Sequence, residues 1–454
     1  MKNPHTDSIT DPQAIEAYLR SGCKERAAWG IGTEHEKFAF HKDTLRPIPY
    51  ESPSDSDASI ANFLRGMCTQ DSEPYREGEH VLGCLSPRGS ITLEPGGQIE
   101  FSSSVVETLH RACAAMHEHL YLAKRVAEPL NMGLLGVGFL PLWSRDDVPW
   151  MPKRRYEIMR QRMVQKGKLG IDMMKRTCTV QVNLDFDSEE MMVQCLRIGL
   201  ALQPIVVALF ANSPFTEGRL NGFLSYRSHV WTDTDPERCG ILPFVFDDGF
   251  GFRRYVDYIL DVPMYFIRRE GTYYDVRGRS FRDFMAGKLV GFESWRPTLE
   301  DVKDHMSTIF TEVRLKTFVE MRGADGGNLQ RLCALSAFWV GLLYDDAVRE
   351  TCYQWIKDWS PDTHQSLRTM IPKEGLHMRM GSQTIAEIAR DTLALAERGL
   401  KNRKRYNQKG QDESIFLEPL FAQVKKGTTP AEDIIDLWKK NNKSMEAIYQ
   451  HLAY

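Results

Sequence analysis

Glutamates recur at short intervals in two segments of this chain, where their spacing would place several carboxylates together. Glu34 and Glu36 alternate in the segment GTEHEKF, and Glu94 precedes Glu100 in the segment EPGGQIEF. Because alternate side chains of a β-strand share one face, Glu34 and Glu36 would point the same way. Like charges side by side repel each other, so a sheet rarely presents them without a cation. Hard oxygen ligands of this kind suit Mg²⁺ or Mn²⁺ better than zinc.

A third strand with charged residues on one face is predicted at residues 312–321. Arg314, Glu320 and Arg322 would lie on that face, with a glycine-rich turn after Arg322. Guanidinium groups beside a cluster of metal ions suggest phosphoryl transfer, in which both spread the developing negative charge. Two alternatives remain open. The acidic faces could be solvated edges that prevent aggregation, and Arg322 could form a surface ion pair with Asp325.

Residues 176–186 predict an amphipathic strand with an uncharged polar face. Apolar side chains alternate there with amides and hydroxyls, among them Gln181 and Asn183. The apolar face needs a layer of helix behind it, and residues 188–210 are suited to provide one. The opposite face, with its neutral amides, is well suited to orienting a small polar ligand.

Aromatic, arginine and hydroxyl side chains gather between residues 212 and 231. Loops of this composition often build a pocket for a carboxylate or a zwitterion. The planar fork of Arg227 could clamp a carboxylate. The alternative is a purely structural loop around a buried Trp231.

Composition limits the class of protein. The chain has 454 residues, 42% of them hydrophobic and 26% charged, and a net charge of −3, as in a globular protein without a basic surface for nucleic acid. The longest apolar run, residues 198–210, is interrupted by Gln203 and Pro204 and is too short to span a bilayer. The polar residues 1–7 lack the apolar core of a signal peptide. We therefore expect a cytoplasmic protein that binds neither nucleic acid nor membranes.

The order of the predicted helices and strands indicates one catalytic unit over residues 1–454. It comprises an N-terminal helix within residues 1–28, a sheet-rich core over residues 29–328 and a helical C-terminal part over residues 329–454 that packs on the core. Within the core, long helices are expected at residues 105–130 and 153–166. There are no internal repeats.

The nine cysteines show no metal-ligand spacing. An odd number of scattered cysteines is typical of a reducing compartment. Cys113 and Cys333 each fall within an apolar stretch that predicts a helix, so packing as buried thiols is the simplest interpretation of both.

The chain resembles the plant and proteobacterial type of glutamate–cysteine ligase. The resemblance runs from about residue 28 to the C-terminus. It is carried by the segments GTEHEKF (32–38), EPGGQIEFS (94–102), RTCTVQVNLDF (176–186), NSPFTEG (212–218), RSHVWTDTD (227–235) and EMRGADGG (320–327). It implies an α+β fold like that of glutamine synthetase, with an antiparallel sheet curved into a funnel and helices outside.

The resemblance also implies the reaction and its ligands. ATP would phosphorylate the γ-carboxylate of L-glutamate, and the amine of L-cysteine would attack the γ-glutamyl phosphate, the first step of glutathione synthesis. Two or three Mg²⁺ ions, or Mn²⁺ in their place, would assist. The implied metal ligands are Glu34, Glu36, Glu94, Glu100, Gln181 and Glu320. Arg322 would face the transferred phosphate together with Arg314, and the expected substrate contacts are Arg227, Tyr265, Asn183 and Arg155.

Plant members of this family carry two cysteine pairs that respond to oxidation. Cys113 and Cys333 match one pair, so the resemblance implies a disulfide between them. The second pair is absent, because the segment around residues 274–291 has Val276 and no cysteine.

We expect a monomer or a homodimer. Three alternatives to the implied function stay open. The acceptor could be another amine, the enzyme could be a small-molecule kinase, or the chain could be a regulator built on an inactive ligase fold.

Overall fold

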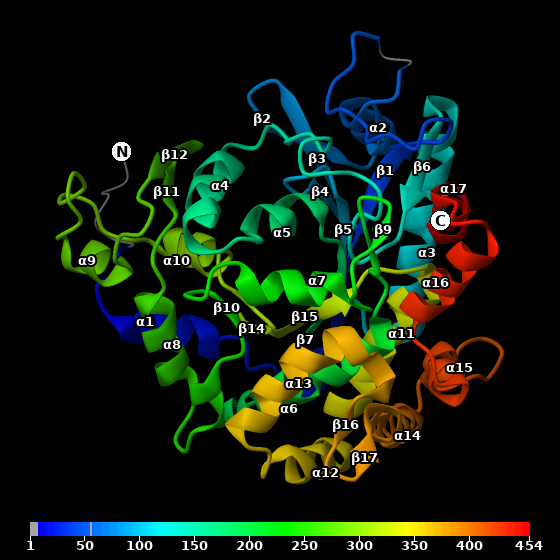
Figure 1. Cartoon of the computed structure of the whole chain (residues 1–454). Coiled ribbons are helices and arrows are strands. Elements are labelled where there is room, and N and C mark those ends of the chain that lie inside the picture. Colours follow the sequence, from blue (N-terminus) through cyan, green and yellow to red (C-terminus); the bar gives the residue numbers. More distant parts are fainter. Residues whose placement is uncertain (1–7, 55–56) are drawn as a thin grey trace.

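A nine-stranded antiparallel sheet forms the centre of the molecule, with helices on both sides (Figure 1). The computed structural model describes residues 8–54 and 57–454, so residues 1–7 of the predicted N-terminal part lie outside it. The strands are β1 (Ile31–His41), β2 (Glu73–Glu77), β3 (His80–Ser86), β4 (Gly89–Leu93), β5 (Ile99–Ser103), β6 (Met132–Leu135), β7 (Thr179–Leu184), β14 (Val313–Leu315) and β15 (Val319–Asp325). Their order is β14-β15-β7-β1-β5-β4-β3-β2, and β6 also pairs with β1. The predicted α+β class is confirmed, and the described strands form an open sheet rather than a closed barrel.

The strand register brings the predicted polar residues onto one face, which we call the site face. Opposite pairs across neighbouring strands are Glu36 and Glu100, Glu34 and Gln181, Glu34 and Ser102, Glu320 and Asn183, and Glu320 and Arg314. Directly opposed residues of an antiparallel sheet have neighbouring side chains on the same face. The register therefore assembles on one face residues that are almost 300 positions apart in the sequence.

The other face of the sheet is largely apolar, with Thr33, His35 and Lys37 of β1 as buried polar exceptions, and it packs against helices. These are α2 (Ile60–Met67), α3 (Leu109–Ala127), α6 (Glu189–Phe210) and α11 (Leu329–Leu343). Val180 and Val182 of β7 are buried there in one core with α6 and α11. The predicted helix layer at residues 188–210 is confirmed.

Local capping explains where these helices begin. The predicted helix at residues 105–130 starts at Leu109 because the Thr108 hydroxyl accepts a hydrogen bond from the backbone N–H of Arg111. Ser188 caps α6 in the same way. The helix α6 continues through Pro204, in agreement with the helix layer expected over residues 188–210. Among the described residues it is the one helix long and apolar enough to cross a membrane. However, 83% of its most apolar 18-residue stretch is buried inside the protein, as in a core helix.

Three helices lie over the site face: α4 (Arg154–Lys166), α5 (Gly170–Arg176) and α7 (Tyr226–Val230), all near the centre of Figure 1. The basic helix predicted at residues 153–166 is α4. On the left of Figure 1 lie α1 (Pro12–Arg20), α8 (Phe252–Asp261), α9 (Phe281–Ala286), α10 (Leu299–Met306) and the hairpin of β11 (Phe266–Arg269) and β12 (Thr272–Asp275).

The C-terminal part is helical, as predicted, and runs along the bottom and right of Figure 1. After α11 it comprises α12 (Asp346–Ile356), α13 (Pro361–Glu374), α14 (Ile385–Arg403), α15 (Glu418–Lys426), α16 (Pro430–Lys440) and α17 (Met445–Leu452). Short strand pairs complete the fold: β8 (Phe215–Thr216) with β9 (Arg219–Leu220), β10 (Cys239–Gly240) with β13 (Phe310–Thr311), and β16 (Arg379–Met380) with β17 (Gln383–Thr384).

The strand predicted at residues 312–321 is instead a hairpin of β14 and β15. The chain reverses between Leu315 and Val319, and the expected glycine turn is part of β15, which continues to Asp325 through an irregularity after Met321. The hairpin still places Arg314, Glu320 and Arg322 together, because Arg314 and Glu320 are directly opposed.

Two disulfides correct the expectation of packed, reduced cysteines. Cys113 of α3 bonds to Cys333 of α11, as the family resemblance implied. Cys68 and Cys84 form a second disulfide that was not foreseen, which ties the end of α2 to β3. The free cysteines among the described residues are Cys23, Cys178, Cys195, Cys239 and Cys352.

The Cys113–Cys333 disulfide spans 220 residues and should dominate the compactness of the unfolded chain. On a non-reducing denaturing gel, the wild type should migrate faster than after reduction, and Cys113→Ser should abolish this difference. The double variant Cys68→Ser/Cys84→Ser is the matched control, because it opens a loop of only 16 residues and should keep the shift. An unchanged shift in Cys113→Ser would show that the long-range bond is absent in solution.

Candidate active site

Four glutamates form a half-buried cluster on the site face: Glu34, Glu36, Glu94 and Glu100. Each accepts a hydrogen bond from a neutral donor. The backbone N–H of Thr179 donates to Glu36 Oε2 (3.0 Å), Asn183 Nδ2 to Glu34 Oε1 (2.8 Å), Ser102 Oγ to Glu100 Oε1 (3.1 Å) and Tyr156 OH to Glu94 Oε1 (3.4 Å). We call these residues the carboxylate cluster. Neutral donors orient its carboxylates but do not balance their charge.

The electrostatics of the carboxylate cluster are unfavourable for negative charge. Burial, and then the charges of Glu320 and Glu100, raise the pKa of Glu34 to about 7. Burial with Glu100 and Glu94 raises the pKa of Glu36 well above its usual value, and burial with Glu94 raises that of Glu100. Such a group of carboxylates gains free energy by binding a proton or a cation.

Glu320 has a different environment because three cations surround it. Arg314 Nε and Nη2 donate to its two carboxylate oxygens at 2.5 and 3.0 Å, and Arg322 Nη1 donates at 3.0 Å, with Lys316 Nζ at 3.5 Å. Burial alone would raise the pKa of Glu320, but these cations hold it well below its usual value. Glu320 is therefore ionised and fixes Arg314 and Arg322 in place.

Arg322 bridges two neighbouring strands. Its Nη1 donates to Gln181 Oε1 at 2.6 Å as well as to Glu320, and 15% of its side chain is exposed. The alternative of a surface ion pair with Asp325 is wrong. Asp325 is buried and accepts hydrogen bonds from the hydroxyls of Ser213 and Ser225, which holds the loop before α7.

Arg227 is buried close to the carboxylate cluster. Its Nη2 donates to the backbone carbonyl of Arg322 at 2.9 Å, while its Nε has no partner among the described residues. Burial lowers its pKa, opposed by the charges of Asp325 and Glu36. The ring of Trp231 lies 6.0 Å from the guanidinium carbon. A buried guanidinium with an unused donor is suited to an anionic ligand.

The other two predicted substrate contacts form their hydrogen bonds outside the carboxylate cluster. Arg155 donates to Ser307 Oγ at 3.3 Å, packs 5.6 Å from the Phe266 ring, and has an Nε without a partner in the described part of the chain. Tyr265 is fully buried, and its hydroxyl points to Met163 Sδ at 3.8 Å. The structure thus places the Tyr265 hydroxyl against a hydrophobic cluster rather than beside the glutamates.

Two lysines belong to the site although neither was proposed as a site residue. Lys153 interacts with Glu94 and Glu100, and Lys316 with Glu320 and Glu34. Burial lowers the pKa of both lysines. Lys316 shares the two-residue spacing of Arg314, Glu320 and Arg322, whereas Lys153 had only the basic character of residues 153–166 as a signal.

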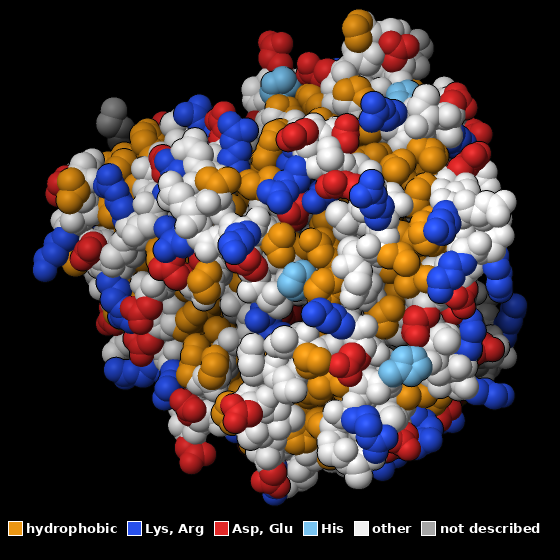
Figure 2. Space-filling view, in the orientation of Figure 1, with side chains coloured by type: hydrophobic (Ala, Val, Ile, Leu, Met, Phe, Trp, Pro, Cys, Tyr) orange, Lys and Arg blue, Asp and Glu red, His pale blue; other side chains and the backbone are white. Residues whose placement is uncertain are grey.

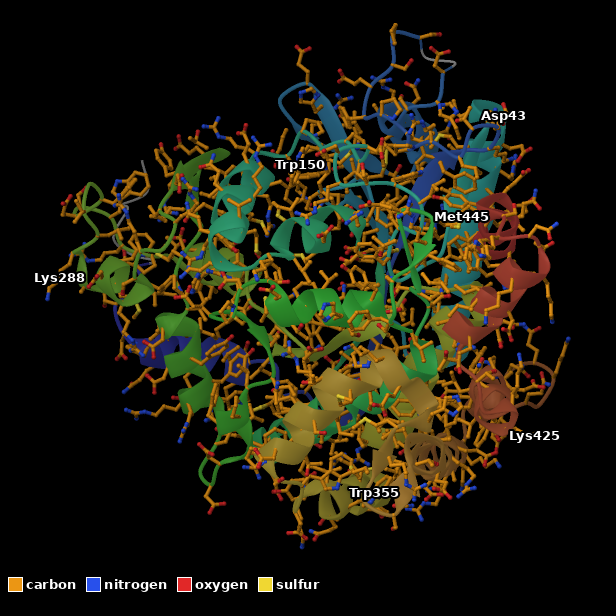
Figure 3. The ribbon with its side chains drawn as sticks, in the orientation of Figure 1. Asp43, Trp150, Lys288, Trp355, Lys425 and Met445 are labelled. Carbon is orange, nitrogen blue, oxygen red and sulfur yellow. A yellow bond between two sulfur atoms is a disulfide. The ribbon has the colours of Figure 1, made fainter. Side chains whose placement is uncertain are left out.

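A cleft of about 640 Å³ opens beside Lys153. Its walls include Arg154 and Arg160 of α4, Tyr273 of β12, and Trp150, which Figure 3 labels above α4 and α5. Arg160 packs 5.5 Å from the Trp150 ring. Elsewhere on this side of the molecule, Lys and Arg side chains are interspersed with Asp and Glu (Figure 2). The cleft therefore offers basic and aromatic side chains, together with Glu77 and Glu157, beside Lys153.

The raised pKa of Glu34 makes a prediction for the metal-free protein. Between pH 4.5 and about 7 the unfolded state loses this proton while the folded state keeps it, so the free energy of unfolding falls as pH rises, by on the order of 3 kcal/mol in total. Glu34→Gln should remove the share of this fall that comes from Glu34, whereas the shares from Glu36 and Glu100 should remain. Denaturant unfolding in chelator from pH 5 to 8 measures it. Glu79→Gln, an exposed control, should follow the wild type, and equal slopes for all three proteins would refute the assignment.

Comparison with known proteins identifies the family. The family model for glutamate–cysteine ligase family 2 matches residues 30–451. The chloroplastic glutamate–cysteine ligase of Nicotiana tabacum is 51% identical over 442 residues, covering 97% of this chain and 82% of the relative. That of Brassica juncea is 50% identical over 451 residues, covering 99% of this chain and 85% of the relative. These names contradict the expected cytoplasmic location, which was wrong, and point to the plastid.

A solved structure supports the fold. The 2.0 Å crystal structure of glutamate–cysteine ligase from Francisella tularensis in complex with AMP matches with a TM-score of 0.56 at 12% identity, covering 93% of this chain and 88% of that one. At that identity the likeness shows a shared fold, that of the glutamine-synthetase-like ligases. With the family match and the relatives at about half identity, the chain belongs to glutamate–cysteine ligase family 2, whose members are ligases of glutathione synthesis.

Proposed function

We propose that this enzyme uses ATP to join the γ-carboxylate of L-glutamate to the amine of L-cysteine through a γ-glutamyl phosphate. The observation that carries the proposal is the pairing of an under-neutralised carboxylate cluster with two positioned arginines, Arg322 and Arg227. A carboxylate reacts poorly with amines because oxide is a poor leaving group, and phosphorylation supplies a better one. The site must therefore handle phosphate and carboxylate groups together.

Arg322 is our choice for the group that faces the transferred phosphate. Hydrogen bonds to Glu320 and Gln181 fix its guanidinium before any ligand arrives, and its remaining donors are partly exposed. A preorganised cation stabilises charge that develops during transfer without the cost of reorganisation. Arg314 is more deeply buried and donates to Glu320 and to the carbonyl of Ile309, so its role in this arrangement is to hold Glu320.

The carboxylate cluster has the chemistry of a divalent-cation site. Its oxygen donors suit Mg²⁺, and the raised pKa values of Glu34, Glu36 and Glu100 are relieved by a cation. As they stand, no three His, Cys, Asp or Glu side chains in the described ranges could hold a metal ion, so binding requires side-chain rearrangement. Bound Mg²⁺ would neutralise the phosphate oxygens and draw the substrates together. Gln181 and Glu320 already accept hydrogen bonds from Arg322, and we place them behind it.

Arg227 and Asn183 are proposed to bind the amino-acid end of L-glutamate. Arg227 has a free Nε for the α-carboxylate, and Asn183 has an Oδ1 without a partner among the described residues that can accept from the ammonium. Arg155 also has an unused donor and is proposed as a further contact. Tyr265 is proposed to support the wall, because Arg238 stacks on its ring at 4.0 Å and its hydroxyl faces a sulfur.

The cleft beside Lys153 is proposed as the side from which ATP enters. Lys153, Arg154, Arg160 and Arg76 supply positive charge that outnumbers Glu77 and Glu157, and Trp150 supplies an aromatic surface. AMP in the Francisella tularensis structure supports a nucleotide as ligand.

The substrate dependence of ADP release tests the proposed reaction. With ATP and Mg²⁺, little ADP should form with L-glutamate alone, and addition of L-cysteine should raise the rate, because the amine consumes the acyl phosphate. Rapid ADP release without any amine would indicate a kinase. Equal or better rates with a different amine would support the alternative of another γ-glutamyl ligase, and no ADP release under any condition would indicate a regulator.

Substitution of cluster glutamates tests the metal assignment. Glu36→Gln and Glu100→Gln should each lower kcat by about 100-fold or more, because each removes a charge that holds the cation. Thermal unfolding of both variants should match or exceed the wild type at pH 8, since a repelled buried charge is removed. Glu79→Gln, on the exposed turn after β2, is the matched control. Near-normal turnover of both cluster variants would refute the assignment.

A further inference from the structure

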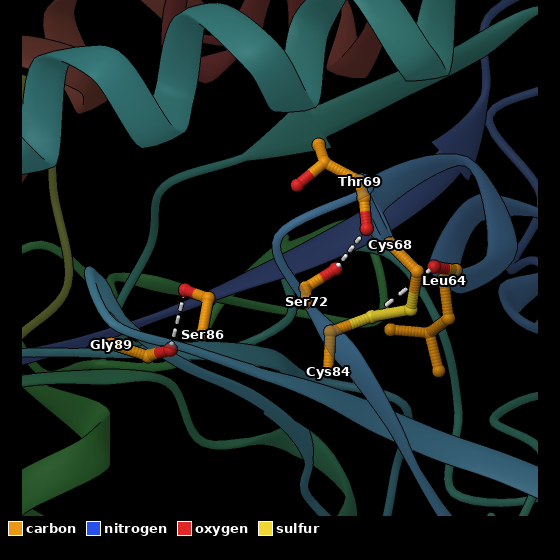
Figure 4. The surroundings of a disulfide bond; sticks show 7 residues. All are labelled: Leu64, Cys68, Thr69, Ser72, Cys84, Ser86 and Gly89. Carbon is orange, nitrogen blue, oxygen red and sulfur yellow. Dashed lines mark hydrogen bonds between the residues drawn. A yellow bond between two sulfur atoms is a disulfide. The ribbon is translucent and has the colours of Figure 1, made fainter.

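The Cys68–Cys84 disulfide borders a cleft of about 440 Å³ on the helix side of the sheet, away from the carboxylate cluster. Figure 4 shows the bond between the end of α2 and β3, with Ser72 and Ser86 nearby. Cys84 itself lines the cleft, and its sulfur lies 3.4 Å from the Leu64 carbonyl oxygen. A disulfide on the wall of a cleft can be reached by a small molecule that the cleft holds.

The cleft has an apolar floor and a charged rim. Ile91, Phe101 and Leu122 contribute the floor, and Arg88 and Glu118 lie at the rim. Both rim side chains are exposed, and neither forms an ion pair with another described residue. Opposite charges on the rim of one small cleft match the two ends of an amino acid.

A buried histidine adds an aromatic ring to the wall of the cleft. His119 lines the cleft, is only 6% exposed, and stacks on Phe101 with ring centroids 4.2 Å apart. Its Nε2 has no hydrogen-bond partner within the described part of the chain. Buried polar groups in folded proteins are generally paired, and this nitrogen, which is itself buried beside His35, is an exception that does not open onto the cleft as the wall stands.

We propose that this cleft binds a small zwitterionic thiol and that the bound thiol exchanges with the Cys68–Cys84 disulfide. The carboxylate of the ligand pairs with Arg88, its ammonium with Glu118, and its sulfur reaches Cys84. L-Cysteine has this chemistry and is the probe. The site is separate from the one proposed for ligation, so its occupancy does not depend on turnover.

The exchange is balanced as follows. The thiolate of the first ligand attacks Cys84 Sγ, forming a mixed disulfide and releasing the Cys68 thiolate, which takes a proton from solvent. A second thiol then attacks the ligand sulfur of the mixed disulfide, which frees the Cys84 thiol and yields the oxidised ligand disulfide. Two ligand thiols are oxidised and one protein disulfide is reduced. Reduction of this disulfide removes the covalent link between the end of α2 and β3. In the sheet, β3 pairs with β4, and β4 pairs with β5, which carries Glu100.

The experiment compares two thiols on the folded, oxidised full chain. L-Cysteine and 2-mercaptoethanol are applied at equal thiolate concentrations, free thiols are trapped with N-ethylmaleimide, and peptide mass spectrometry measures the opening of each disulfide. L-Cysteine should open Cys68–Cys84 about tenfold faster than 2-mercaptoethanol does, because charge pairing retains it in the cleft. Cys113–Cys333 should show no such preference and serves as the internal control.

Rim variants identify the cause of the preference. Arg88→Gln and Glu118→Gln should reduce the preference for L-cysteine to near unity at Cys68–Cys84, whereas Arg111→Gln, an exposed change elsewhere on α3, should keep it. In Cys68→Ser, L-cystine should form a mixed disulfide at Cys84 faster than bis(2-hydroxyethyl) disulfide does. Equal rates for the two thiols in the wild type, or the same preference at both disulfides, would overturn the proposal. None of these readouts requires ligase activity.

Discussion

The two-residue repeat of the β-strand couples the core of this enzyme to its chemistry. In β7, Val180 and Val182 are buried against α11 in a core shared with α6, and this packing leaves Gln181 and Asn183 on the opposite face. A shift of one residue in register would bury the amides and expose the valines, so the hydrophobic core fixes the position of every polar group in the site. Packing on one face of the sheet thus stabilises an electrostatically unfavourable arrangement on the other.

The pKa values of glutamates on this one sheet face shift in opposite directions, and the charges of the neighbouring side chains set the direction. Glu320 lies among Arg314, Lys316 and Arg322 and keeps its charge, whereas Glu34, two strands away on β1, has its pKa raised to about 7. The first kind of glutamate holds cationic side chains in place, and the second kind is left with a charge that only a ligand can balance. The site therefore combines a rigid part with a part that responds to binding.

The sequence alone predicted the parts of this arrangement that depend on local periodicity. The strands of Glu34 and Gln181 and the helices α3, α4 and α6 follow from alternation and from the spacing of apolar residues. The reversal at residues 316–318 was missed because it lacks the glycine or asparagine that usually marks a hairpin turn. The charged neighbours of Lys153 and the pairing of Cys68 with Cys84 depend on contacts between separate elements, which no local pattern encodes. The position of Tyr265 against Met163 is of the same kind.

One hydrogen bond links the two halves of the proposed reaction. The guanidinium of Arg227, on α7, is anchored to the main chain of Arg322, on β15. The group proposed to recognise the amino acid and the group proposed to face the phosphate therefore share one support, and neither can shift without displacing the other. In such an architecture, a substitution that displaces the main chain at Arg322 acts on both groups, so it should change substrate preference and the rate of activation together.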